Sequence, residues 1–135
     1  MCNDRPRWLA ASTHPGEEEQ VWMAHKKIEM VHSRLLTVVV PRHADRGASI
    51  ARKLVALGAL VAQRANGDSI TPKTNIYIAD TMGELGLFFR LCPISFIGKS
   101  LVDLGGQNPI EPARLESAIL FGPHMSNFSN IAECL

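Results

Sequence analysis

A chain of 135 residues with 46% apolar and 20% charged residues is typical of one soluble globular domain with its own core. A net charge of +1 gives no reason to expect the clustered basic surface that nucleic-acid binding requires, so we expect no nucleic-acid partner. The three cysteines, Cys2, Cys92 and Cys134, are odd in number and far apart, which argues against disulfides or zinc and favours a reducing cytoplasm.

The first part of the chain predicts strand, helix and strand. Residues 7–12 are a short apolar run, and the acidic residues 17–19 after the Ser-Thr-His-Pro-Gly loop are typical of a first helical turn. Apolar residues then recur at helical spacing and predict one helix face packed on a sheet, at Val21, Ala24, Ile28 and Val31. Residues 35–40 are apolar and largely β-branched, as in a strand that is covered on both faces.

The same alternation continues to the end of the chain. Ile50, Leu54 and Leu57 predict a helix ended by Gly58, and strands follow at residues 59–63 and 75–79. The remaining predicted elements are a helix at 84–91, a strand at 94–98, a helix at 111–115, a strand at 118–121 and a helix at 127–134. The pattern predicts a single α/β domain over residues 1–135, a Rossmann-like doubly wound parallel sheet whose ligand lies beyond the carboxyl ends of the strands.

Four loops fall at these strand ends, and each precedes a predicted helix: residues 12–16, 41–43, 80–86 and 105–112. A helix N-terminus offers unpaired N–H groups and the positive end of the helix dipole. It can therefore stabilise a phosphate without a net positive charge on the protein. The loops contain no Gly-x-Gly-x-x-Gly fingerprint, no Walker sequence and no metal-type spacing, which argues against NAD, P-loop ATP and metal sites.

The spacing of residues leaves more than one role open in each loop. Asn108 and Glu111 suit a helix cap with its dipole partner, and equally a site in which Glu111 accepts ribose hydroxyls. Ser12 and Thr13 resemble an ordinary N-cap more than phosphate ligands. Arg42 suits either a surface position or an anion contact.

The loop at residues 80–86 leaves a similar choice. Its glycines allow the backbone to approach a flat base closely, but an ordinary turn explains the same residues.

Taken together, five ordered blocks resemble the Kdo (3-deoxy-D-manno-octulosonic acid) transferases of lipopolysaccharide synthesis. They are STHPGEEE at 12–19, PRH at 41–43, DTMGELG at 80–86, GGQNPIEP at 105–112 and LFGPHMSNF at 120–128. Their order and approximate spacing, from Trp8 onward, are similar to those of the C-terminal half of that family.

The resemblance implies the donor half of a GT-B glycosyltransferase. Its C-terminal domain is expected to bind the donor CMP-Kdo, or CMP, without a cofactor or a metal. A separate N-terminal domain, absent from this chain, is expected to bind the lipid A precursor, to supply the catalytic base and to make any membrane contact. The isolated chain is then expected to be inactive, and the full-length enzyme to lie in the cytoplasm on the inner membrane.

The resemblance also implies a set of donor contacts. The phosphate region would include Ser12, Thr13 and Arg42, and the cytosine region Met82, Gly83, Glu84 and Leu85. The sugar side would include Gly106, Gln107 and Asn108. Glu111 would contact the ribose, and Asn127 would belong to a loop that closes against the nucleotide. The chain departs from the family pattern at Lys99, Gln107 and residues 116–118, which bears on the sugar subsite and leaves the fold intact.

Two other functions remain open. Another GT-B donor domain that takes a UDP-sugar would use the same loops and the same acidic residue. A non-catalytic nucleotide-binding or interaction domain could retain the fold without the chemistry.

Overall fold

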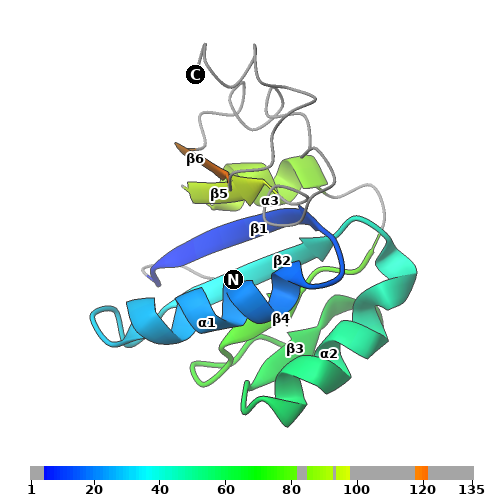
Figure 1. Ribbon diagram of the computed structural model, residues 1–135, viewed down its shortest axis with the longest axis horizontal. Helices are drawn as coiled ribbons and strands as arrows, with labels where there is room; N and C mark the ends of the chain where they lie inside the picture. Colours follow the sequence, from blue (N-terminus) through cyan, green and yellow to red (C-terminus); the bar gives the residue numbers. More distant parts are fainter. Residues whose placement is uncertain (1–4, 82–84, 93, 98–117, 122–135) are drawn as a thin grey trace.

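The computed structural model describes residues 5–81, 85–92, 94–97 and 118–121. Within them, six parallel strands form one sheet in the order β3-β4-β2-β1-β5-β6 (Figure 1). The strands are β1 (Arg7–Thr13), β2 (Leu36–Pro41), β3 (Val61–Gln63), β4 (Ile76–Ile78), β5 (Ile94–Ile97) and β6 (Ala118–Phe121). The helices are α1 (Glu17–Glu29), α2 (Gly47–Ala56) and α3 (Leu85–Leu91), with short 3-10 turns η1 (Ala44–Arg46) and η2 (Arg64–Asn66).

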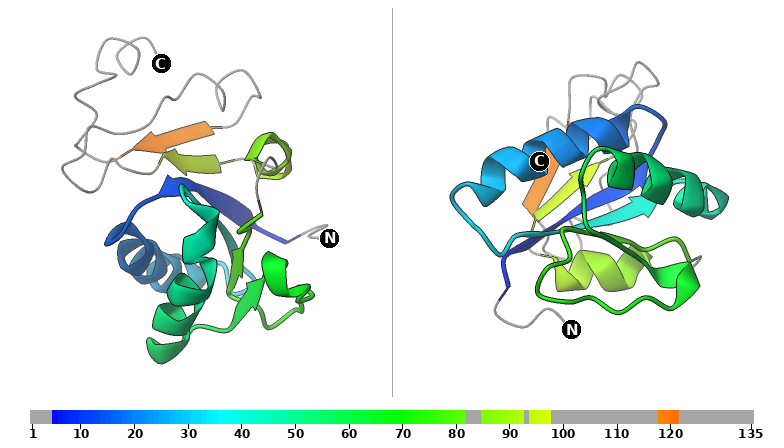
Figure 2. Two further views of the ribbon diagram at one scale, coloured as in Figure 1. Left: turned by 90° about the vertical axis from the view of Figure 1, so that its right-hand side faces the viewer. Right: turned by 90° about the horizontal axis from the view of Figure 1, so that it is seen from below.

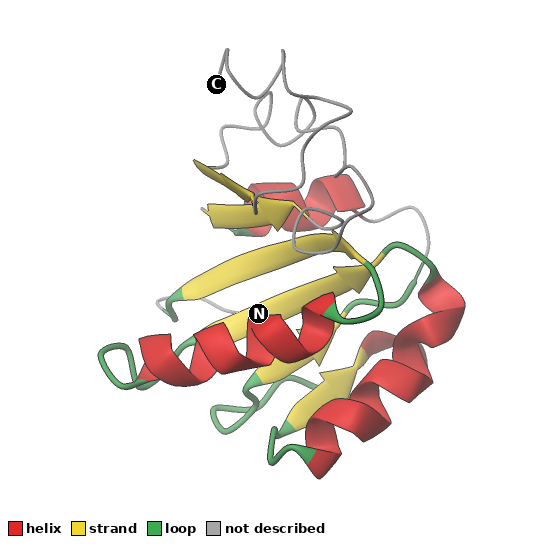
Figure 3. Ribbon diagram, in the orientation of Figure 1, coloured by secondary structure: helices red, strands yellow, loops and turns green. Residues whose placement is uncertain are grey.

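Helices cover both faces of the sheet, because its central strands bury alternate side chains in two separate cores. Helices α1 and α2 pack on one face, where Trp22 and Leu54 lie in one cluster with Val39 of β2. Helix α3 packs on the other face, where Phe88 lies in a second cluster with Val38. The two layers are visible on opposite sides of the strands in Figures 2 and 3. This arrangement confirms the predicted doubly wound parallel sheet and the two-sided burial of residues 35–40.

The predicted helices at 111–115 and 127–134 lie outside the described residues. The other predicted helices and strands are present with bounds that move by a few residues. A helix edge is set by which backbone groups find partners, and the apolar pattern fixes that only approximately.

The apolar face predicted for α1 is partly wrong. Val31 is 80% exposed because the helix ends at Glu29, before that residue, and Ile28 in the last turn is 38% exposed. Trp22 and His25 are buried on the inner side instead. The core accommodates the His25 ring because its Nδ1 lies 2.7 Å from the Thr37 hydroxyl oxygen, which gives the buried nitrogen a hydrogen-bond partner.

The predicted stop of α2 at Gly58 is confirmed, but Leu57 does not join the buried face of the helix. Leu57 is 49% exposed, since the helix ends at Ala56 and Leu57 serves as its C-cap. Gly58 then takes φ 99°, the left-handed conformation that commonly ends a helix.

The order of the strands reverses beside β1. The chain leaves β1 toward β2, β3 and β4 on one side, and then crosses through α3 to β5 on the other side. Loops that depart in opposite directions leave a crevice at the carboxyl ends of such strands. At this point the register of β1 against β2 shifts between Ala11 and Thr13, and Ser12 has φ 57°.

Candidate ligand-binding site

A pocket of about 580 Å³ with both polar and apolar walls opens at the carboxyl ends of β1, β2 and β4. Its walls are Ser12, Val40, Pro41, Arg42, His43, Ala44, Asp45, Ala79, Thr81 and Leu85. The fold thus brings together Ser12, Arg42 and Leu85, three of the predicted donor contacts, which come from three separate segments of the sequence. The volume lies within the range of small-molecule sites.

Ser12 adopts an unusual backbone conformation at the edge of this pocket. Its φ of 57° falls in the left-handed region, where a non-glycine residue costs about 1–3 kcal/mol. Such residues gather at ligand sites and persist where the surrounding structure holds them. The next carbonyl, that of Thr13, accepts the backbone N–H of Arg42 at 3.0 Å. The β1–α1 loop and the β2–η1 loop are therefore bonded directly to each other.

The Arg42 side chain favours an anionic group at its end of the pocket. The Arg42 side chain is exposed, and its guanidinium group can pair with a phosphate through two parallel hydrogen bonds. The neighbouring His43 ring lies edge-on to His14 from the β1–α1 loop, with ring centroids 6.1 Å apart. Asp45 also lines the pocket and was missed by the sequence analysis. Its carboxylate favours a ligand that carries hydrogen-bond donors as well as negative charge.

The N-terminus of α1 is occupied by the protein's own carboxylates. Its N-cap is Gly16, with no side-chain hydrogen bond, so neither Ser12 nor Thr13 caps this helix. Instead, the Glu17 carboxylate accepts the His14 backbone N–H at 2.9 Å. With residues 17–19 all acidic, the positive end of this dipole is already compensated.

Thr13 is fully buried and does not line the pocket. Within the described residues its hydroxyl has no hydrogen-bond partner, so its carbonyl is the group that connects the two loops. The other sequence-derived contacts lie outside the described residues: Met82, Gly83, Glu84, Gly106, Gln107, Asn108, Glu111 and Asn127. Lys99 and residues 116–118 lie outside them as well.

Asp80, directly after β4, is a buried carboxylate whose role the sequence analysis missed. It accepts hydrogen bonds from the Gln63 side chain at 2.6 Å and from the Ala65 backbone N–H at 2.8 Å. It also lies against Gly47 at the start of α2, where an added Cβ would be 1.9 Å from its Oδ2. An acidic residue directly after a buried strand, at the head of the DTMGELG block, is the sequence signal that could have indicated it.

A second hollow of about 630 Å³ lies on the α1 face near the amino ends of β1 and β5. It is mostly apolar, with Trp8, Val21 and Phe96 among its walls. We assign the candidate site to the carboxyl-edge pocket, because ligands of parallel sheets bind there and need polar groups that fix their orientation. In the described part of the chain, no helix is long and apolar enough to cross a membrane. The same residues contain no cluster of three or more His, Cys, Asp or Glu side chains suited to a metal ion.

A doubly wound parallel sheet with a pocket at the carboxyl ends of its strands is typical of the class of Rossmann-like domains. No family model matches the chain. The chain is 36% identical over 132 residues to the 3-deoxy-D-manno-octulosonic acid transferase of Haemophilus influenzae, covering 98% of this chain and 31% of that protein. It is 38% identical over 130 residues to the probable mitochondrial 3-deoxy-D-manno-octulosonic acid transferase of Arabidopsis thaliana, covering 95% of this chain and 29% of that protein.

The structural comparison agrees with these relatives. The C-terminal CMP-Kdo binding domain of WaaA from Acinetobacter baumannii matches with a TM-score of 0.90 and 34% identity, over 98% of this chain and 69% of that one. The chain therefore belongs to the Kdo transferase family of GT-B glycosyltransferases and corresponds to their C-terminal domain. It spans about a third of the length of the curated relatives named above.

Proposed function

We propose that this chain is the domain of a Kdo transferase that binds the donor CMP-Kdo, and that the carboxyl-edge pocket receives the donor. One observation carries the proposal. The Acinetobacter baumannii domain, described as CMP-Kdo binding, has the same fold over 98% of this chain. The pocket found here lies at the sheet edge where that fold class binds nucleotides.

The described residues suggest how the phosphate end would be held. The Arg42 guanidinium would pair with the phosphate, and the Ser12 hydroxyl would donate to a second phosphate oxygen. When the sugar is transferred, CMP leaves with its negative charge, and fixed donors near the phosphate stabilise that charge. Contacts from residues 82–85, 106–108, 111 and 127 to cytosine, sugar and ribose stay predictions from the sequence.

The rest of the reaction is assigned to another domain. The proposal places the catalytic base, the lipid A precursor and any membrane contact there, with the enzyme in the cytoplasm at the inner membrane. It requires no cofactor and no metal in this chain, since the donor phosphate would be held by side chains and backbone groups.

A nucleotide panel read by isothermal titration tests the donor class. We expect the 135-residue chain to bind CMP more tightly than UMP or UDP. Equal heats for CMP and UMP would contradict the Kdo-specific proposal and favour a UDP-sugar domain. No binding of any nucleotide would favour an interaction module without a donor.

Arg42 gives a sharper test of the pocket. Arg42→Ala removes a charge-assisted contact and should weaken CMP binding by roughly tenfold to a hundredfold. Arg52→Ala is the matched control, because Arg52 is exposed on α2 and does not line the pocket. Equal CMP affinities of the two variants would show that the phosphate does not bind at Arg42.

The proposal also predicts that the chain alone does not transfer Kdo. Transfer needs the acceptor held against the donor in one geometry, and a loss of positioning forfeits effective molarities of roughly 10⁵ M or more. The assay combines CMP-Kdo with a lipid A precursor, with and without a separately produced N-terminal half of a family member. Transfer by this chain alone above background would show that it carries its own base and acceptor site.

A further inference from the structure

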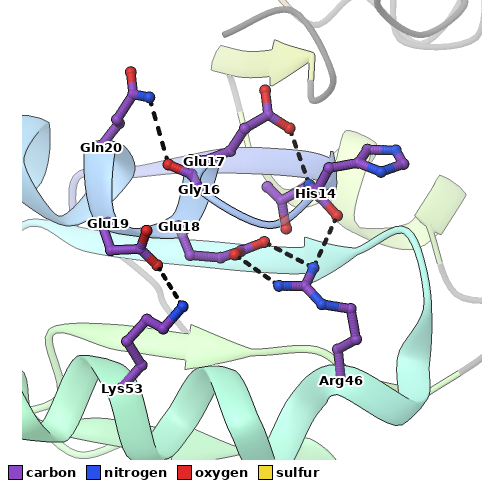
Figure 4. A network of polar contacts seen from close by, with 9 residues as sticks. His14, Gly16, Glu17, Glu18, Glu19, Gln20, Arg46 and Lys53 are labelled. Carbon is purple, nitrogen blue, oxygen red and sulfur yellow. Dashed lines mark hydrogen bonds and ion pairs between the residues drawn. The ribbon is translucent and has the colours of Figure 1, made fainter. Parts of the chain in front are cut away.

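A network of partly buried polar groups braces the loop between β1 and α1 (Figure 4). Glu18 in the first turn of α1 is only 1% exposed, and both of its carboxylate oxygens accept hydrogen bonds from Arg46. The distances are 3.0 Å from Nη2 to Oε1 and 3.2 Å from Nη1 to Oε2. Arg46 ends η1, which follows Arg42 in the next pocket loop. The bidentate pair therefore joins α1 to η1, the two elements that directly follow the β1 and β2 segments of the pocket.

The same guanidinium group reaches the backbone beside Ser12. Arg46 Nη1 lies 3.5 Å from the Thr13 carbonyl, which also accepts the Arg42 backbone N–H at 3.0 Å. On the other side of the loop, the Glu17 carboxylate holds the His14 N–H. The residues that follow Ser12 are thus fixed from two directions, while Ser12 itself keeps φ at 57°. A left-handed non-glycine residue persists only where its surroundings hold it in this way.

We propose that the Glu18–Arg46 pair is a positioning element of the donor pocket. It holds Ser12 in its left-handed conformation and so fixes Ser12 relative to Arg42, the two groups proposed to contact the donor phosphate. This inference rests on the proposed function for its consequence in binding. Neither Glu18 nor Arg46 lines the pocket, so the pair acts through the loop and does not touch the ligand.

A second ion pair, between α1 and α2, provides a control that distinguishes a positioning role from simple bracing. Lys53 of α2 lies 3.2 Å from Glu19 of α1, and these side chains are 51% and 33% exposed, against 22% and 1% for Arg46 and Glu18. Exposed pairs contribute little to stability. A buried ion pair loses much of its Coulomb attraction to the cost of desolvation, so its net contribution to stability is small. Its main effect is then to hold the two side chains in one defined geometry. Glu19 and Glu18 are adjacent in one helical turn, but only Glu18 pairs with Arg46, which reaches the Thr13 carbonyl.

The test compares Glu18→Gln and Arg46→Lys with the control Glu19→Gln in the 135-residue chain. CMP affinity is measured well below the unfolding transition, and the Cα and Cβ chemical shifts of Ser12 report its backbone conformation. We expect Glu18→Gln to weaken CMP binding about tenfold and to move the Ser12 shifts away from left-handed values. Arg46→Lys keeps the charge but loses the fork that engages both oxygens, so it should behave like Glu18→Gln. Glu19→Gln should match the wild type.

The opposite result is equally clear. If Glu18→Gln and Arg46→Lys bind CMP like Glu19→Gln and keep the Ser12 shifts, the pair is merely a stabilising contact, even if their melting temperatures fall. If the wild-type chain binds no CMP, the proposed function fails. In that case the Cα and Cβ chemical shifts of Ser12 in the variants are the remaining test of whether the Glu18–Arg46 pair holds the β1–α1 loop.

Discussion

Replacement of Gly47 by Ala should destabilise the fold, although Ala is ordinarily the better helix former. Gly47 begins α2 directly against Asp80. An added Cβ would lie 1.9 Å from the Asp80 Oδ2 and 2.6 Å from its Cβ and Cγ. A rotation of the carboxylate cannot clear the contact with the Asp80 Cβ. Either α2 or the end of β4 must therefore shift, and the hydrogen bonds of Asp80 to Gln63 and Ala65 must stretch.

The expected magnitude follows from these contacts. Overpacking costs about 1–3 kcal/mol. The loss of a hydrogen bond to a charged group adds about 1.5–3 kcal/mol. Ala regains at most about 1 kcal/mol over Gly in a helix. We therefore expect Gly47→Ala to lower the free energy of unfolding by about 3 kcal/mol, and the melting midpoint by roughly 10 °C for a domain of this length.

Urea and thermal unfolding followed by circular dichroism measure this change. Gly67→Asn is a suitable control, since Gly67 has φ 73° and an added Cβ there has no neighbour within 4 Å. Asn tolerates the left-handed region, so the control should change the free energy of unfolding by less than about 1 kcal/mol. A Gly47→Ala protein as stable as the wild type would refute the reasoning, because it would mean that Asp80 is not held against α2.

Two further predictions concern protonation and ribose recognition. Burial lowers the pKa of His25 below its ordinary 6.5, and nearby Glu29 opposes this shift. The neutral ring is therefore favoured in the folded state, so the free energy of unfolding should be highest above pH 6.5 and fall as the pH drops below it. His25→Asn should flatten this pH dependence in urea titrations, and an unchanged slope would assign it to other groups. Glu111→Gln should weaken CMP binding by roughly tenfold to a hundredfold and 2′-deoxy-CMP binding less. Equal losses for both nucleotides would leave Glu111 as a helix-dipole partner only.

The strands and the location of the pocket could be predicted from the sequence because they depend on local patterns. The β-branched run at 35–40 has few alternatives to a buried strand, and it appears as Leu36–Pro41. Loops at the carboxyl ends of parallel strands meet at one edge, so residues from separate loops were correctly expected to converge there. Three of them line the same pocket.

The inner face of α1 could not be predicted in the same way. Helical periodicity identifies an apolar face but not the residue at which the helix ends, and Val31 lies beyond that residue. His25 is polar by composition, and only the Thr37 hydroxyl on β2 makes its burial acceptable. Pairings such as Glu18 with Arg46 join residues 28 positions apart. Neither partner carries a local signal of the other, so these contacts depend on tertiary structure.

The structure also changes how anion binding at this edge is explained. The sequence suggested that helix N-termini would supply positive potential, but α1 begins with three glutamates, and two of them are buried. Its dipole is therefore committed to the protein's own carboxylates, and one of them already accepts the His14 N–H. Under the proposed function, the contribution of these two loops to phosphate binding depends on a single exposed guanidinium group, that of Arg42, and on a strained Ser12 close to it. A site with so little excess charge gains affinity from fixed geometry. Arg46→Lys preserves the charge but loosens the β1–α1 loop. It should therefore weaken donor binding more than the removal of a positive side chain far from the pocket.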